Sequence, residues 1–195
     1  IIFTYVGQSG EYAVAGYGVG TRIEQVVLLP ILGINTAIIS IIAQNFGANN
    51  LIRIKETYFT AIKYAFIIMI TAGALVFLSA GVITSFFSND PDVIEYGKRY
   101  LKISAFVLPA YPVFFLSNGF FMALKKSENA MISNFFRNIL NPIAIFYIAK
   151  YINASFETFF WLWVMINWFF SISYFFIVIY YFKLKLNKLS TVVHP

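Results

Sequence analysis

Three charged side chains lie well inside long apolar segments, and they are the residues most able to carry chemistry. Arg22 and Glu24 fall within residues 12–44, and Arg137 falls within residues 129–149. A charge surrounded by hydrocarbon costs at least about 2.5–3.5 kcal/mol on insertion scales, so each one needs a partner, water or a function. Arg22 and Glu24 would project about 200° apart on a helix, so they cannot form one salt bridge there.

The two faces of this helix carry different polar residues. Arg22 shares a face with Gln25, whereas Glu24 shares the other face with Asn35. For Arg22, a substrate or ion pathway and a structural ion pair to another helix are equally compatible with the sequence. For Glu24, a structural or interfacial role is favoured over a functional one. We take Arg22, Gln25, Glu24 and Asn35 together as the candidate substrate or ion pathway.

A second polar group surrounds Arg137. Asn134, Asn138 and Asn141 lie within a few residues of it. Amide side chains inside a membrane commonly hydrogen-bond between helices, and an arginine near a helix end can extend its charge to the interface. We therefore predict an inter-helix polar cluster here, in preference to a binding site.

Prolines and glycines mark the places where helices should bend or approach closely. Pro30 removes one helical hydrogen bond and Gly33 loosens the same turn, so we predict a helix break there. Gly16 and Gly20 form a small-xxx-small pair, which favours close helix contact. Three further prolines inside apolar segments act in the same way as Pro30, namely Pro109, Pro112 and Pro142.

Composition determines the class of protein. Hydrophobic residues make up 60% and charged residues 11% of the chain, whereas soluble domains are about a quarter charged. Its uncharged stretches exceed the roughly 18–20 residues that cross a bilayer as a helix, and the short alternating segments of a barrel are absent. We predict an all-α membrane protein, a polytopic helical bundle forming a single transmembrane domain over 1–195, with helices at about 1–6 (partial), 12–44, 51–87, 91–124, 129–149 and 156–184 and a tail at 185–195.

The basic residues set the orientation of this bundle. Successive crossings place the loops near 50 and 126 on the same side as the tail, and this side carries the larger number of cations, which predicts that it is cytoplasmic. The net charge of +6 is spread over short loops, so nucleic acid is not expected as a partner. The cations of the cytoplasmic side are Arg53, Lys55, Lys63, Lys125, Lys126, Lys183, Lys185 and Lys188, and those of the other side are Lys98, Arg99, Lys102 and Lys150.

Signals for catalysis are lacking. The chain has no cysteine and one histidine, His194, which lies in the tail. The sequence contains no catalytic triad, no paired catalytic carboxylates and no cluster of metal ligands. We expect neither an enzyme nor a bound metal or cofactor.

The sequence resembles the multidrug and toxic compound extrusion (MATE) family over essentially its whole length, most specifically in its second segment. The resemblance rests on the small-residue helix at 13–25, the Pro30-x-x-Gly33 motif and the loop Gln44-Asn45-Phe46-Gly47-Ala48. The stretch Asp90-Pro91-Asp92-Val93 resembles the start of the family's tenth helix, and the segment that carries Arg137 before Pro142 is similar to its eleventh. The Arg-Ile-Glu-Gln version at 22–25 looks most like the DinF-like branch, in which the position of Arg22 faces the cavity.

The resemblance implies a fold, a function and a location. The chain would form the end of helix 7 plus helices 8–12, one lobe of a two-lobe twelve-helix transporter. Its partners would be membrane lipid, a missing N-terminal lobe of the same protein and small-molecule substrates. The family exports amphiphilic or cationic compounds in exchange for Na⁺ or H⁺, and the coupling-ion site would lie largely outside this fragment. We expect a multi-pass protein of a bacterial inner (plasma) membrane with a cytoplasmic C-terminus.

Two alternatives stay open at this point. A lipid-linked saccharide flippase of the same superfamily would share the fold, although such proteins tend to have several basic residues in the cavity. A non-transporting membrane subunit would instead bury the Arg22 stripe against a partner.

Overall fold

The fold of the chain is entirely helical in a computed structural model that describes the backbone of residues 1–193 and the side chains of residues 1–184. In this part of the chain, three helices are long and apolar enough to cross a membrane, as the composition predicts. Residues 194 and 195, including His194, and the side chains of the predicted tail from 185 onward lie outside the described residues. The elements are α1 (Ile2–Val6), the 3₁₀ turn η1 (Gly7–Ser9), α2 (Glu11–Gly47), α3 (Leu51–Ser85), α4 (Pro91–Ser104), α5 (Ala110–Ala123), α6 (Ser127–Phe135), the π-helical turn η2 (Phe136–Leu140), α7 (Asn141–Tyr151) and α8 (Phe156–Val193).

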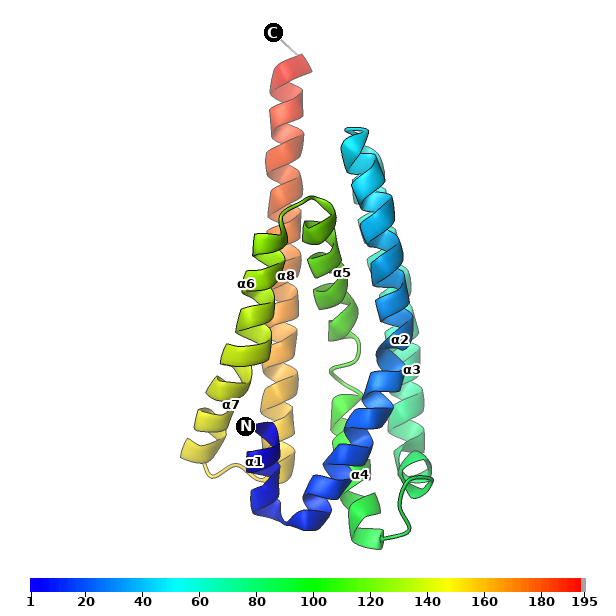
Figure 1. Cartoon of the computed structure of the whole chain (residues 1–195), viewed down its shortest axis with the longest axis vertical. Coiled ribbons are helices and arrows are strands. Elements are labelled where there is room, and N and C mark those ends of the chain that lie inside the picture. The colour runs from blue at the N-terminus through cyan, green and yellow to red at the C-terminus, as the bar shows by residue number, and fades with distance from the viewer. Residues whose placement is uncertain (194–195) are drawn as a thin grey trace.

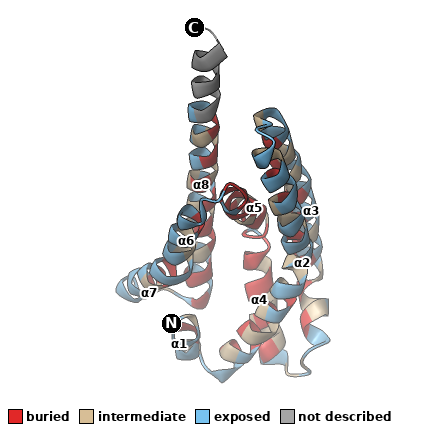
Figure 2. Cartoon of the chain, turned by 45° about the horizontal axis from the view of Figure 1, so that its top comes forward, coloured by how far each residue is buried: buried red, intermediate tan, exposed pale blue. Residues whose placement is uncertain are grey.

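The helices form an elongated bundle with α4 and α5 in the middle. Figure 1 shows α2 and α3 side by side along one flank, and α6, α7 and α8 along the other. Helices α4 and α5 contact α2 and α3 on one side and α8 on the other. Figure 2 shows that buried residues concentrate on these central helices and on the facing side of α8. A carboxyl or hydroxyl on an inner face is therefore shielded on several sides.

Local capping explains where α3 and α4 begin. The Asn50 side chain accepts a hydrogen bond from the Arg53 amide at 3.0 Å, and Asn49 turns the chain with a positive φ of 53°. Asp90 caps α4 by accepting from the amide of Asp92 at 2.9 Å, and Pro91 occupies the first helical position. Both devices satisfy amides that have no partner inside the helix. Asp90 followed by Pro91 is a pattern typical of a helix N-terminus, and both residues lie there in the structure.

The predicted continuous helix over 91–124 is wrong, because the structure divides it into α4 and α5. Pro109 and Pro112 each lack the amide hydrogen of a regular helical bond, and they lie close enough together to interrupt consecutive turns. The intervening residues 105–109 form tight turns, in which the Val107 amide donates to Ser104 at 2.9 Å and the Ala110 amide to Val107 at 2.9 Å.

The helix break predicted at Pro30 and Gly33 is absent, since α2 continues as a helix through both residues to Gly47. A single proline removes one hydrogen bond, and the turns on either side retain theirs. The second irregular site lies before Pro142, where residues 136–140 form a π-helical turn. Pro142 cannot donate to the carbonyl of Asn138, which is consistent with the widened turn at this point.

The small-residue pair of α2 packs closely against α4, as its spacing predicts. A Cβ atom placed on Gly16 would lie 2.7 Å from the backbone nitrogen of Gly97, and one on Gly20 would collide with the ring of Tyr100. Such close approach of two helices requires residues without side chains. It brings the middle of α2 near Tyr100.

Candidate functional site

The carboxyl group of Glu24 lies at the junction of three helices. Tyr100 of α4 and Tyr111 of α5 both donate their hydroxyl hydrogen to it, the second across 2.5 Å to Oε1. The two tyrosines stand on either side of the α4–α5 interruption, so both broken halves meet the same carboxyl. A carboxylate that accepts charge-assisted hydrogen bonds from two directions ties these helices to α2.

A small pocket opens beside this carboxyl, and we call it the Glu24 pocket. Its volume is about 150 Å³, enough for several waters or an ion but less than the roughly 300 Å³ of a typical small-molecule site. Oxygen atoms of Glu24, Thr21 and Gln25 stand in a largely aromatic wall, and hard cations prefer oxygen ligands. The lining residues are Ile2, Tyr17, Thr21, Glu24, Gln25, Leu28, Tyr100, Tyr111, Phe160 and Trp163.

Arg137 extends the polar network across the bundle. Its guanidinium lies 4.2 Å from the ring centroid of Phe114 and 4.9 Å from that of Tyr111, the same tyrosine that donates to Glu24. Its Nε donates to Oδ1 of Asn167 on α8 at 3.1 Å, and Asn167 donates in turn to the Trp163 carbonyl at 2.8 Å. Charged and polar side chains thus connect α2, α5, the π-helical turn and α8 in one continuous series of contacts.

Replacing Arg137 by lysine should weaken this connection although it keeps the charge. Lysine lacks the planar guanidinium that stacks on Phe114 and donates to Asn167 at the same time. We expect Arg137→Lys to destabilise the full-length protein by about 1–2 kcal/mol, measured by thermal unfolding in detergent. Lys150→Arg, on an exposed residue, is the control. Equal melting temperatures for Arg137→Lys and the wild type would contradict the proposed role of the guanidinium.

The predicted polar cluster around Arg137 is divided between two neighbouring helices. Asn134 accepts from Asn118 of α5 at 3.4 Å, and the oxygen of Asn118 also accepts from Tyr174 of α8 at 3.2 Å. Asn138 is exposed. Asn141 is 2% exposed, and neither polar atom of its amide has a hydrogen-bond partner among the described residues.

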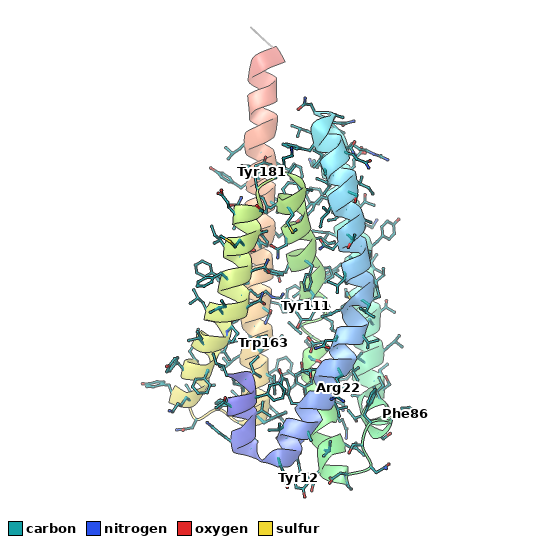
Figure 3. All side chains as sticks on the ribbon, viewed as in Figure 1. Tyr12, Arg22, Phe86, Tyr111, Trp163 and Tyr181 are labelled. Carbon is teal, nitrogen blue, oxygen red and sulfur yellow. The ribbon has the colours of Figure 1, made fainter. Side chains whose placement is uncertain are left out.

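The predicted pathway residues of α2 do not all meet. Glu24 and Gln25 line the Glu24 pocket. Arg22 is exposed and lines no part of the pocket. In Figure 3, Arg22 of α2 lies at a lower level than Tyr111 of α5 and Trp163 of α8, which are near the middle height of the bundle. Asn35 lies further along α2, where its buried Oδ1 has no hydrogen-bond partner in the described structure and faces Gly119 of α5.

Sequence reasoning missed the partners of the charged residues. Tyr100 and Tyr111 are 76 and 87 residues from Glu24, and Asn167 is 30 residues from Arg137. Only one signal was available, because an intramembrane charge requires a partner and tyrosine and asparagine are the common candidates. Within residues 1–184, no group of three or more histidine, cysteine or acidic side chains could hold a metal ion.

Comparisons with curated proteins find transporters among the relatives. The chain is 24% identical over 77% of its length to the probable multidrug resistance protein YpnP of Bacillus subtilis. It is 23% identical over 79% of its length to a FAD transporter of Shewanella oneidensis, and 27% identical over 68% to the multidrug export protein MepA of Staphylococcus haemolyticus. The matches cover 32%, 34% and 29% of these proteins, so the chain spans about a third of the length of its relatives.

Solved structures share the fold of the chain. A MOP superfamily transporter from Pyrococcus furiosus, described as having a binding pocket of reverse polarity, matches 97% of the chain with a TM-score of 0.87 at 22% identity. A MATE transporter crystallised in complex with MaL6 matches 93% with a TM-score of 0.82 at 21% identity. The chain covers 42% and 40% of these structures, which identifies its fold as one lobe of the transporter.

The family assignment follows from the sequence profile, whereas the DinF-like branch stays a prediction. The profile described as MatE matches residues 1–148, which is most of the chain. The match includes Glu24, Tyr100, Tyr111 and Arg137. The chain therefore belongs to the MatE family, as the motifs of its second helix predict.

Proposed function

We propose that this chain forms part of a cation-coupled exporter of small amphiphilic or cationic compounds, and that Glu24 is the group for which substrate and coupling cation compete. The supporting observation is the arrangement of Glu24, a carboxyl inside a membrane-spanning helix that lines a pocket and binds two tyrosines of the interrupted helix. Multidrug resistance and export proteins among the relatives agree with this function. Transport is assigned to the whole protein, of which this chain supplies one lobe.

The hydrogen bonds of Glu24 provide a physical means of coupling. A proton, Na⁺ or an organic cation that neutralises the carboxylate weakens its hold on Tyr100 and Tyr111, because hydrogen bonds to a charged acceptor are about twice as strong as neutral ones. The contacts between α2 and the α4–α5 pair then change with the ligand. A ligand can shift a conformational equilibrium only by such a difference in interaction between two states.

The remaining pathway residues have proposed supporting roles. Gln25 supplies an amide beside the carboxyl. Arg22 is exposed on α2 at the level of the pocket, where a companion lobe would complete the cavity, whereas Asn35 lies further along α2 against Gly119 of α5. Pro30 removes one hydrogen bond from the continuous helix α2, and Gly33 lies in the next turn, so the helix would bend more easily here as the lobes rock.

The proposed setting is a bacterial inner membrane with the C-terminus in the cytoplasm. Na⁺ and H⁺ are both compatible with a single carboxylate, and acidic groups in the companion lobe would complete the coupling. An export assay with the full-length protein in proteoliposomes tests this function. Efflux of a cationic dye should rise under an imposed Na⁺ or pH gradient, whereas dye efflux insensitive to both gradients would contradict it.

Arg22→Ala should lower export about tenfold or more and leave the protein folded. Arg22 is exposed and forms no ion pair or hydrogen bond within residues 1–184, so its loss breaks no contact of this lobe. We expect dye efflux in cells to fall by about tenfold or more, a factor that corresponds to ~1.4 kcal/mol, with normal protein in the membrane. Arg53→Ala, which removes an exposed ion pair on α3, is the control. Poor accumulation of Arg22→Ala with normal efflux per molecule would show a structural role.

The flippase alternative receives less support from the site. Such proteins tend to have several basic residues in the cavity, but the guanidinium of Arg137 already donates to Asn167 and stacks on the ring of Phe114. Among the relatives, the FAD transporter carries an anionic compound, so anionic substrates belong in the same assays.

A further inference from the structure

A wide apolar groove lies where α3 and α8 flank the interruption between α4 and α5, and we call it the α3–α8 groove. Its volume is about 540 Å³, within the range of ligand sites. Along α3 it extends from Ile70 to Leu78, a length of about 12 Å at 1.5 Å per residue. Aromatic side chains line much of it, namely Phe77, Phe106, Trp161 and Trp168.

This groove faces away from the Glu24 pocket. The residues of α8 that line the groove are Trp161, Val164 and Trp168, and their spacing of three and four residues places them on one helix face. Trp163, which lines the Glu24 pocket, projects about 200° from Trp161. Leu78 on the wall of the groove and Leu75 beside it are 81% and 62% exposed. A companion lobe would cover the opposite side, at the Glu24 pocket, so the apolar side that carries the groove is the one left to the hydrocarbon of the bilayer.

The interruption of the helix shapes the floor of the groove. Gly73 of α3 lies against the break, because a Cβ atom there would lie 2.9 Å from the carbonyl oxygen of Ala105. Trp168 donates its indole N–H to the Phe106 carbonyl at 2.8 Å. Backbone carbonyls at membrane depth need partners or cover, and Trp168 supplies one partner from the wall of the groove.

A cation stands at the edge of this apolar surface. The Nζ of Lys102 lies 5.5 Å from the ring centroid of Phe77, a residue of the groove wall. One turn earlier, Lys98 is paired with Glu95 at 3.3 Å, whereas Lys102 forms no ion pair among the described residues. An amphipathic lysine can lay its stem on apolar surface and present its charge to the headgroup region.

We propose that the α3–α8 groove binds one anionic phospholipid of the bilayer, with an acyl chain along Phe77, Phe106 and Trp161 and its phosphate on Lys102. The groove supplies a hydrocarbon slot and Lys102 supplies the complementary charge, so the chemistry matches both parts of the lipid. A bound chain covers the carbonyls of the α4–α5 break. This proposal does not depend on the transport function, because no residue of the groove lines the Glu24 pocket.

Quenching of Trp161 by brominated lipids tests the proposal in the full-length protein. The protein is placed in two sets of vesicles, one with brominated phosphatidylglycerol and the other with the same fraction of brominated phosphatidylcholine. The difference in tryptophan fluorescence between the wild type and Trp161→Phe isolates the signal of Trp161. We expect the anionic lipid to associate about five times more strongly, the factor given by one lysine near the membrane surface. Equal quenching by the two lipids, or no quenching of Trp161 by either, would overturn the proposal.

Matched variants separate the headgroup site from the acyl slot. Lys102→Ala should abolish the preference for the anionic lipid, so that both lipids associate about equally. Lys102→Arg should keep the preference, and Lys150→Ala, at an exposed cation elsewhere, should leave it at about fivefold. Ala74→Phe, which fills the groove, should lower quenching of Trp161 by both lipids, whereas Leu75→Phe on the neighbouring exposed face should not. A preference for the anionic lipid that survives Lys102→Ala, or quenching unchanged by Ala74→Phe, would contradict the assignment.

Discussion

Replacing Glu24 by glutamine should reduce export by about 100-fold and leave the fold intact. Glutamine has nearly the same shape, and its amide oxygen still accepts from one tyrosine while its NH₂ group can meet the other. Glutamine has no negative charge for which the substrate and the coupling cation could compete. A factor of 100 corresponds to ~2.7 kcal/mol, the range expected for hydrogen bonds to a charged group. The measurement is dye efflux divided by the amount of protein in the membrane.

Three companion variants separate a functional Glu24 from a structural one. Glu11→Gln removes an exposed carboxyl near the start of the same helix and should be neutral. Tyr100→Phe and Tyr111→Phe each remove one hydrogen bond and keep the charge, so each should lose only about tenfold. If Glu24 were purely structural, Glu24→Gln would lower the amount of folded protein while efflux per folded molecule stayed normal.

Gly16→Ala should have the largest effect on stability among the substitutions considered. The added Cβ would lie 2.7 Å from the Gly97 nitrogen and 2.8 Å from the Val93 carbonyl oxygen, and these backbone atoms cannot rotate away. Overpacking at a close contact costs about 1–3 kcal/mol and occasionally more, and we expect ~3 kcal/mol here, because α2 and α4 must separate.

Gly18→Ala is the matched control, because no atom lies within 4 Å of a Cβ placed at Gly18. Alanine is favoured over glycine inside a helix by about 1 kcal/mol, so this variant should be neutral or more stable. Thermal unfolding of the purified full-length protein measures both. Equal melting temperatures for Gly16→Ala and Gly18→Ala would mean that the two helices do not pack through Gly16.

The membrane fold and several local features could be predicted from the sequence because their causes are local. Long uncharged stretches require spanning helices, and Asp90 before Pro91 is a capping pattern that needs no tertiary information. The Gly16 and Gly20 spacing likewise predicts a close helix contact. The interruption at 105–109 could not be located, since a proline weakens a helix wherever it occurs. Pro30 lies within a continuous helix, whereas Pro109 lies at a break where Trp168 bonds a neighbouring carbonyl.

Only the charged residue of the candidate site, and not its partners, could be predicted from the sequence. Glu24 stands out by its charge, but its partners are 76 and 87 residues away and follow no periodic pattern. Sequence alone therefore favoured a structural or interfacial role for Glu24 and weighted Arg22 more heavily. Once Tyr100 and Tyr111 are seen to meet at one carboxyl beside a pocket, Glu24 becomes the better candidate for exchange.

Cation release on substrate binding tests most directly whether Glu24 is the exchange site. Purified full-length protein is titrated with an organic cation while a pH-sensitive dye reports H⁺ and an electrode reports Na⁺. Wild-type protein should release one of these cations as substrate binds, and Glu24→Gln should release markedly less, while Glu11→Gln behaves as wild type. The same release from Glu24→Gln as from the wild type would place the exchange at another group and contradict the proposed site.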